Sequence, residues 1–251
     1  MIDPIFSILY QTSNKVIHTG TGFLVYKNGV FITAGHVFRK KEINGKPISN
    51  KLFRAVFFHN GEPVIYKIKH THYKSNKIWQ QKYPEFLDIA IGLLEDCNLD
   101  YLRLDRRRPL KGEQLCAKAY INQETHSYGD CFSNLKNLTL LEPKKLDNMI
   151  VLEDNALITD LPQYYKMKRD EVPIKYFYNN CITLSEKFIP SASGCPILDE
   201  RNYVRAMLIG APSKEIDLSI TYALLAKHCS KSIQHRSPYI YEPFEYLSID
   251  K

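Results

Sequence analysis

A histidine closes an apolar, β-type run in the sequence Phe31-Ile32-Thr33-Ala34-Gly35-His36-Val37. Another β-type run precedes it, in Gly20-Thr21-Gly22-Phe23-Leu24-Val25. Between the two runs lies Asn28-Gly29, a strong signal for a tight hairpin turn. The sequence therefore predicts two adjacent antiparallel strands, with His36 at a glycine-assisted turn where the second strand closes.

Two later motifs also place a polar residue beside a strand. Asp88 stands at the entry to a continuous apolar run over residues 89–94, which predicts a buried strand. Ser193 lies among small residues in Pro190-Ser191-Ala192-Ser193-Gly194-Cys195-Pro196-Ile197. Each motif alone is common, because a histidine at a strand end is usually packed or solvated and a Ser-Gly pair usually belongs to a loop. Their order along one chain, histidine, aspartate and then serine, is more informative.

Short β-type runs separated by turn signals recur along all 251 residues. Beyond those above they lie at residues 52–58, 64–69, 114–120, 135–140, 149–152, 182–184, 196–198, 204–209 and 219–224. A charged segment at 96–112 predicts a linker, and residues 160–178 predict a long surface loop. Only residues 223–233 have a helical pattern. Many short strands in two halves indicate an all-β protein built from barrels.

We therefore expect two domains. The first, over residues 1–100, is a β-barrel that carries His36 and Asp88. The second, over residues 101–251, is a β-barrel that carries Ser193 and ends in a short helix and a tail. A chain of this length has room for two barrels of about 100 residues each, with a sizeable core.

The composition excludes several classes of protein. Hydrophobic residues make up 44% of the chain and charged residues 24%, which is typical of a folded globular protein and not of a disordered one. No stretch approaches the 18 apolar residues of a membrane span, and the first residues lack the pattern of a secretory signal.

Lys and Arg number 34 against 27 Asp and Glu, a net charge of +7, but the basic clusters are scattered. The pattern argues against nucleic acid as a partner.

The six cysteines show no pairing motif. None belongs to a Cys-x-x-Cys pair, and the spacing of Cys and His gives no zinc pattern, so we expect neither a metal nor another cofactor. Without a secretory signal, the thiols are expected to be reduced and the protein cytoplasmic.

Taken together, the three motifs resemble those of the trypsin-like serine proteases, which have the chymotrypsin fold. The similar blocks of that family are Thr-Ala-Ala-His, Asp-Ile-Ala-Leu and Ser-Gly-Gly-Pro, matched here by Thr33-Ala34-Gly35-His36, Asp88-Ile89-Ala90-Ile91 and Ser193-Gly194-Cys195-Pro196. Residues 220–224 resemble a Gly-Phe-Ala-Ile-Pro stretch of HtrA-like bacterial members. The resemblance spans about residues 18–233 and implies two packed six-stranded antiparallel β-barrels.

The resemblance implies a serine endopeptidase that cleaves protein or peptide substrates through an acyl-enzyme. Ser193 would be the nucleophile, His36 the general base and acid, and Asp88 the carboxylate that orients the imidazole. A serine hydroxyl needs such a base because it is a weak nucleophile at neutral pH, where imidazole titrates. The backbone N–H groups of Ser193 and Ser191 would form the oxyanion hole.

Three residues depart from the family pattern. Ser191 stands where the family usually has glycine, so the oxyanion hole can be unformed at rest, and we expect a substrate or an activating protein partner to order it. Ala192 replaces an aspartate that pairs with the new N-terminus of cleaved zymogens, which argues against activation by cleavage. Val37 replaces a cysteine that is common in secreted relatives, which favours an intracellular enzyme.

The pocket for the side chain before the cut bond would have two walls. By resemblance, one comes from residues 185–190, including Lys187, Phe188 and Ile189, and the other from Leu208, Ile209 and Gly210. Lys187 lies six residues before Ser193, at the position that sets charge selectivity in digestive relatives. A Lys187 that points inward favours acidic substrates, but a one-residue shift puts an apolar side chain there. We expect a preference for apolar or small residues first, acidic second and basic third.

A function from another class is also compatible with the sequence. The same scaffold without catalysis is a binding module, in which the barrels hold a peptide and basic loops at 39–41 and 166–169 hold an acidic partner.

Overall fold

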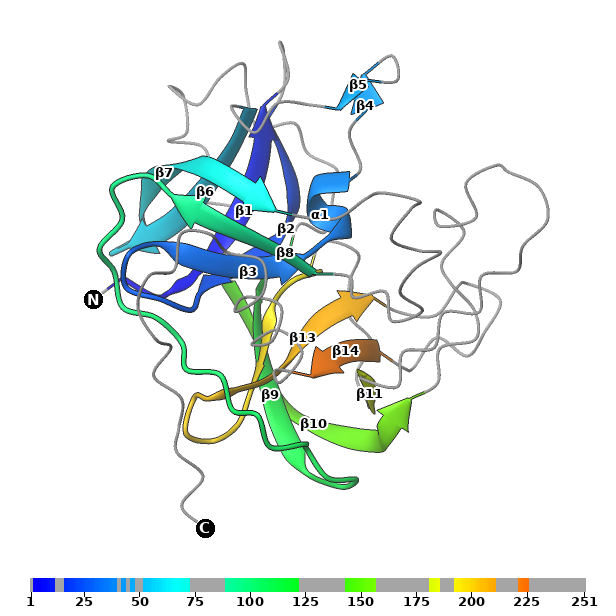
Figure 1. Cartoon of the computed structure of the whole chain (residues 1–251). Coiled ribbons are helices and arrows are strands. Elements are labelled where there is room, and N and C mark those ends of the chain that lie inside the picture. Colours follow the sequence, from blue (N-terminus) through cyan, green and yellow to red (C-terminus); the bar gives the residue numbers. More distant parts are fainter. Residues whose placement is uncertain are drawn as a thin grey trace, which may run out of the picture.

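The first barrel of the computed structural model uses the strands of the N-terminal half (Figure 1). Residues 2–11, 16–39, 42–43, 46–47, 52–72, 89–121, 143–156, 181–185, 192–210 and 221–225 are described. The strands follow one another around the barrel in the order β1 (Ile5–Gln11), β2 (Val16–Leu24), β3 (Val30–Ala34), β8 (Ile89–Leu94), β7 (Glu62–His72) and β6 (Phe53–His59). Antiparallel pairing of β1 with β6 closes it. A separate two-stranded sheet consists of β4 (Glu42–Ile43) and β5 (Lys46–Pro47).

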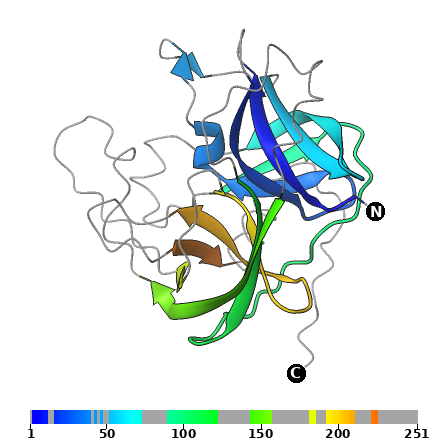
Figure 2. The ribbon, with the colours of Figure 1, turned by 180° about the vertical axis from the view of Figure 1, so that it is seen from behind.

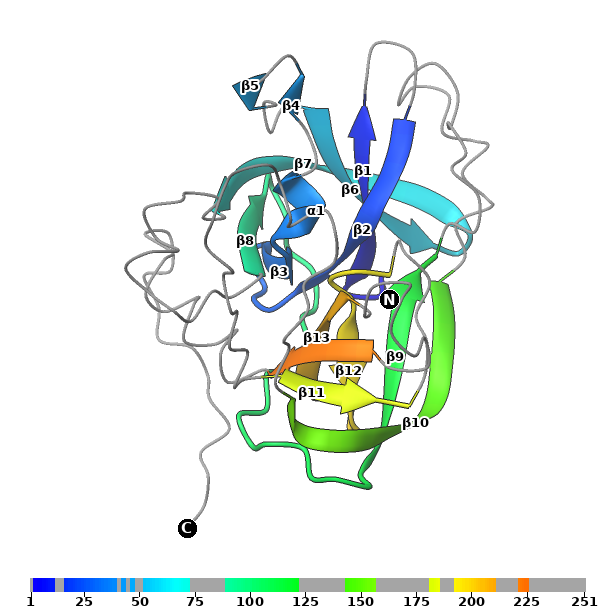
Figure 3. The same ribbon diagram turned by 90° about the vertical axis from the view of Figure 1, so that its right-hand side faces the viewer.

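The second barrel lies below the first in Figure 1 and in the views from behind and from the side (Figures 2 and 3). Its order is β10 (Pro143–Ala156), β11 (Cys181–Leu184), β14 (Thr221–Leu225), β13 (Val204–Gly210), β12 (Pro196–Leu198) and β9 (Gln114–Tyr120), with β10 again beside β9. Two closed antiparallel barrels of six strands confirm the expected fold.

Aromatic rings fill the first barrel. Phe6, Phe31 and Phe57 are fully buried, with ring centroids 5.2 Å apart for Phe6 and Phe31 and 4.7 Å apart for Phe6 and Phe57. Gly92 of β8 makes room for this packing, because a Cβ there would overlap the ring of Phe31. Burying each such ring stabilises the fold by roughly 1.5–3 kcal/mol.

The segment expected to be a linker connects the two barrels, over residues 95–113, and this inter-barrel connection is held to both of them. In Figure 1 it descends along the side of the molecule from β8 to β9. Leu102 N–H donates to Leu24 O at 2.9 Å in the first barrel, and Asp105 N–H donates to Val204 O at 2.9 Å in the second. Asp105 is only 3% exposed. The connection is therefore held to both barrels by backbone hydrogen bonds.

Two expectations need correction. Residues 223–225 of the expected C-terminal helix belong to strand β14, where they pair with β11, and the rest of that helix lies outside the described residues. Strand β1 was not expected, because its apolar run is buried along almost its whole length and shows no alternation. The expected strand at 135–140 and the loop at 160–178 lie outside the described residues.

Helix is nearly absent from the part of the chain that the structure describes. The one helix there, α1 (His36–Arg39), has four residues. No described helix is long and apolar enough to cross a membrane.

Candidate active site

Ser193 lies in a tight turn directly before β12. Gly194 adopts a φ of 89°, which favours glycine, and Cys195 N–H donates to Ala192 O at 3.1 Å. Strand β13 holds this turn from one side, because Gly194 N–H donates to Leu208 O at 2.8 Å and Leu208 N–H donates to Cys195 O at 3.0 Å. Ala192 and Cys195 are fully buried in the second barrel, while Ser193 between them is partly exposed.

The first barrel holds the same turn from the other side. Thr21 N–H of β2 donates to the carbonyl oxygen of Ser193 at 2.9 Å. Two glycines make this close approach feasible. A Cβ at Gly20 would lie 2.8 Å from Ser193 O, and a Cβ at Gly194 would overlap Thr33 Oγ1 and Thr21 O.

Thr21 is itself fixed by three contacts from neighbouring strands. The hydroxyl of Thr33 on β3 donates to Thr21 O at 2.6 Å, and both groups are buried. Thr21 Oγ1 accepts from Tyr120 N–H of β9 at 3.1 Å and donates to Tyr120 O at 3.4 Å. The contact with Ser193 thus rests on a buried network that joins both barrels.

His36 begins α1 two residues after β3 ends. Phe38 N–H donates to Gly35 O at 3.2 Å, and Val37 and Phe38 are buried, so the first turn of α1 is fixed against the barrel. Val37 also packs beside Gly20, where an added Cβ would lie 2.5 Å from Val37 Cγ2. The backbone at His36 is therefore close to the contact between Thr21 and Ser193, while its side chain lies outside the described part.

Asp88 lies outside the described residues, but its neighbour in sequence does not. Ile89 opens β8 and pairs with Ala34 at the end of β3. The start of β8, which follows Asp88, thus lies beside the end of β3, which precedes His36. The structure brings together the segments that lead to the three motifs.

The residues assigned to the oxyanion hole and pocket are only partly described. Ser191, Lys187, Phe188 and Ile189 fall outside the described ranges. On β13, Leu208 packs in the second barrel's core and Ile209 in the larger cluster of the first barrel, with 2% and 7% of their surface exposed. The backbone of Gly210 pairs with Tyr222 of β14. The pocket stays a prediction.

Comparison of the sequence with protein-family models and with curated proteins found no match. Comparison with solved structures found several proteases of the same architecture. The Rv3671c protease of M. tuberculosis in its inactive form is 13% identical, with a TM-score of 0.56 over 92% of this chain and 88% of that one. The MamO protease domain from Magnetospirillum magneticum is 12% identical, with a TM-score of 0.58 over 91% and 94%. The scabies mite inactivated protease paralogue S-D1 is 9% identical, with a TM-score of 0.57 over 92% and 90%.

The chain has the chymotrypsin fold. This confirms the fold implied by the motifs, whereas the closer likeness to HtrA-type members stays a prediction. The hydrogen bond between Thr21 and Ser193 lies between the two barrels of this fold.

Other candidate groups near this site are less suited to catalysis. Burial raises the pKa of the Cys195 thiol far above its ordinary value, so Cys195 stays protonated and unreactive. Elsewhere, Ser7 Oγ on β1 lies 2.7 Å from His18 Nδ1 on β2, but Ser7 is fully buried and out of reach of a substrate. Within the described ranges, no group of three or more His, Cys, Asp or Glu could hold a metal ion.

Sequence reasoning missed the supporting residues of the candidate site. Thr21 and Thr33 both lie inside the quoted motifs, but no feature of the sequence indicated that they contact each other. The Gly-Thr-Gly pattern at 20–22 was the available signal, since a polar residue between two glycines in an apolar strand indicates close backbone approach.

Proposed function

We propose that this chain is a serine endopeptidase that cleaves protein or peptide substrates. Ser193 acts as the nucleophile, His36 as the general base and then acid, and Asp88 as the carboxylate that orients the imidazole. The observation that carries the proposal is the hydrogen bond from Thr21 N–H to Ser193 O, because it fixes the serine turn against the strands that lead to His36.

The proposed reaction has two halves. In acylation, Ser193 Oγ bonds to the carbonyl carbon of the substrate while its proton passes to His36, which then gives it to the leaving amine as the C–N bond breaks. In deacylation, water gives a proton to His36 and bonds to the acyl carbon, and the proton returns to Ser193 as the ester breaks. Backbone N–H groups of Ser193 and Ser191 would stabilise the oxyanion in both halves.

Two features support serine rather than cysteine chemistry. Ser193 is the partly exposed residue of its turn, between buried neighbours. Cys195, two residues later, has no exposed surface, and burial raises the pKa of its thiol. A nucleophile has to reach the substrate, which favours Ser193.

We further propose that the enzyme is cytoplasmic and is completed by its substrate or by an activating protein partner. Free thiols at Cys97, Cys116 and Cys195 are compatible with a reducing compartment. Serine at position 191, where the related fold usually has glycine, supports an oxyanion hole that must be ordered before turnover.

The rival proposal is a protease-fold binding module for a protein or an acidic partner. It is favoured by one observation, that structures of this fold include an inactivated protease paralogue and an inactive form of a protease. The net charge of +7 suits an acidic partner.

A fluorophosphonate probe, which reacts with activated serines, separates the two functions. The enzymatic function predicts covalent labelling at Ser193 that is lost in Ser193→Ala and retained in the control Ser7→Ala. Ser7 is a suitable control because its hydroxyl also lies beside a histidine, 2.7 Å from His18 Nδ1, but is fully buried and out of reach of the probe. Labelling that persists in Ser193→Ala, or its absence with every partner and substrate tried, would contradict the proposed function.

A further inference from the structure

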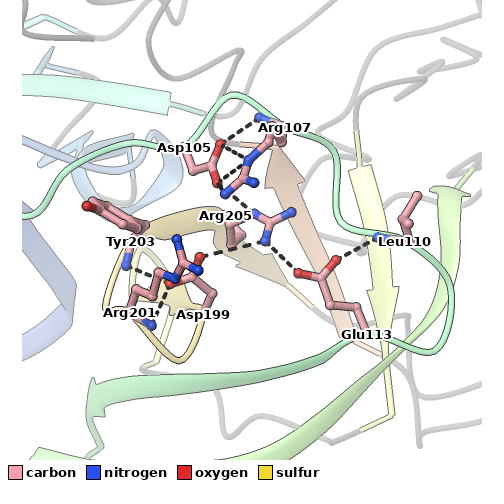
Figure 4. Close-up of polar contacts among 8 residues, drawn as sticks. All are labelled: Asp105, Arg107, Leu110, Glu113, Asp199, Arg201, Tyr203 and Arg205. Atoms are coloured by element: carbon pink, nitrogen blue, oxygen red, sulfur yellow. Dashed lines mark hydrogen bonds and ion pairs between the residues drawn. The ribbon is translucent and has the colours of Figure 1, made fainter. Parts of the chain in front are cut away.

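A buried arginine on β13 joins its strand to two other segments, the inter-barrel connection and the turn between β12 and β13 (Figure 4). Arg205 is only 7% exposed. Its Nη1 lies 2.5 Å from Glu113 Oε1 and 3.7 Å from Asp199 Oδ2, and its Nε lies 3.6 Å from Asp105 Oδ2. The three carboxylates come from the inter-barrel connection (Asp105 and Glu113, which precedes β9) and from the turn between β12 and β13 (Asp199).

Each carboxylate is also fixed by a second group, as Figure 4 shows. Arg107 Nη2 lies 2.6 Å from Asp105 Oδ2. Glu113 Oε2 accepts from Leu110 N–H at 2.9 Å. Asp199 Oδ1 accepts from two backbone N–H groups of its own turn, at 2.9 and 3.0 Å. We call Arg205 and the three carboxylates the clamp. Its shortest contact is the hydrogen bond from Arg205 to Glu113, while the buried Nε faces Asp105 as an ion pair without a hydrogen bond.

The clamp acts on the strand that holds the serine turn. Arg205 precedes Leu208 by three residues on β13. Leu208 makes the two backbone hydrogen bonds by which β13 holds the serine turn, one to Gly194 and one to Cys195. The partner strand β12 has only three residues, and its register with β13 shifts between Ile197 and Leu198. A pair with only three registered positions has few backbone hydrogen bonds of its own. The side-chain contacts of Arg205, which lie beside the register shift, therefore add to what holds the two strands together.

We propose that Arg205 is a positioning residue, which holds β13 in register through Asp105, Glu113 and Asp199 so that Leu208 keeps the Ser193 turn in place. It touches neither substrate nor reacting atoms. The consequence for catalysis rests on the proposed function, whereas the consequence for the turn does not.

The charges of the cluster make Arg205 hard to replace. Three carboxylates face two guanidinium groups, Arg205 and the more exposed Arg107. Removing Arg205 leaves the carboxylates of Asp199 and Glu113 without their buried countercharge, and such groups separate or take up water. Both responses loosen the side-chain contacts that hold β13, and leave the backbone hydrogen bonds of Val204 with Arg103 and Asp105 to hold the strand to the inter-barrel connection. A lysine at 205 keeps the charge but not the planar fork of donors, so it restores the clamp only in part.

Kinetics on the full chain test the proposal. Arg205→Met, Arg205→Lys and the control Lys145→Met are compared below their unfolding midpoints. The control breaks an exposed ion pair in the same barrel, Lys145 Nζ to Asp147 Oδ1 at 2.8 Å. We expect Arg205→Met to lower kcat on a peptide substrate about 10–100-fold with little change in KM, Arg205→Lys to recover part of the loss, and Lys145→Met to match the wild type. An unchanged kcat in folded Arg205→Met would overturn the proposal.

Amide hydrogen exchange separates this inference from the proposed function. In Arg205→Met the N–H groups of Gly194 and Leu208 are expected to exchange about 10-fold faster or more, while Ala34 and Ile91 of the first barrel keep their wild-type rates. This expectation for hydrogen exchange stands even if no probe labels the wild-type protein. In that case only the proposed enzymatic function is refuted. Wild-type exchange at both amides would refute the positioning role.

Discussion

Thr21 N–H and the carbonyl oxygen of Ser193 are 2.9 Å apart, and this hydrogen bond crosses from the first barrel to the second. The proposed nucleophile therefore depends on a strand of the barrel to which it does not belong. Because β2 and β3 are fixed together by the Thr33 hydroxyl, a change in the first barrel's interior is transmitted to the serine turn.

Thr33→Val tests this dependence. Valine has the shape of threonine but leaves Thr21 O without its buried donor, so we expect the free energy of unfolding to fall by about 1–3 kcal/mol. We also expect slower probe labelling of Ser193, because Thr21 is less firmly held. Urea unfolding and labelling rates check both effects. Thr33→Ser keeps the hydroxyl and should stay nearer the wild type, and wild-type labelling by Thr33→Val would refute the coupling.

Asp105 gives stability a defined pH dependence. Burial raises the pKa of its carboxyl, but hydrogen bonds from Arg107 and the charges of Arg205 and Arg107 outweigh this and hold the pKa below its ordinary value. The unfolded carboxyl titrates near pH 4, so the stabilisation is complete above about that pH and is lost as the pH falls through the lower pKa of the folded state. In urea titrations, the stability difference between wild type and Asp105→Asn should therefore shrink below about pH 4. A difference that is constant over this range would contradict the ion pairing.

Local sequence signals predicted much of the fold. Strands β3, β8, β9 and β13 were expected because their apolar runs are bounded by turn residues. The run in β1 was missed because it is buried on nearly all sides, so it has no period to detect. The three motifs identified the segments of the candidate site because each motif is a short local pattern in the sequence. The clamp around Arg205 had no such signal, since residues 105, 113, 199 and 205 meet only through the fold.

The thiol of Cys195 should be inert in the folded protein. Its Sγ is buried, and burial raises the pKa of the thiol, so neither access nor thiolate is available. At mildly alkaline pH we expect iodoacetamide to modify partly exposed Cys116 first and Cys195 only after unfolding in guanidinium chloride. Peptide mass mapping after timed alkylation checks this order. Early modification of Cys195 would show that the turn opens in the native state.

The proposed catalytic residues should behave as one unit. Ser193→Ala and His36→Ala are each expected to abolish peptide cleavage without loss of the fold, and the double variant should be little worse than either, because each change alone disables the same proton transfer. Asp88→Asn should lower turnover roughly 10⁴-fold, as the same change does in serine proteases where it stabilises the wrong imidazole tautomer. Additive losses in the double variant would point to separate roles.

Gly194→Ala tests how closely the two barrels must approach at the serine turn. Gly194 and Gly112 have nearly the same φ, 89° and 86°, so alanine costs about 1–2 kcal/mol of backbone strain at either position. Their surroundings differ, because a Cβ at Gly112 meets nothing within 4 Å, whereas at Gly194 it overlaps Thr33 Oγ1 and Thr21 O. Overpacking of this kind adds roughly 1–3 kcal/mol. We therefore expect urea unfolding to show a clearly larger loss for Gly194→Ala than for Gly112→Ala. Labelling of Ser193 should be slowed only in Gly194→Ala, because only there does relief of the overlap push the turn away from Thr21. Equal losses of stability in the two variants, with equal labelling, would mean that the barrels are not in close contact at Ser193.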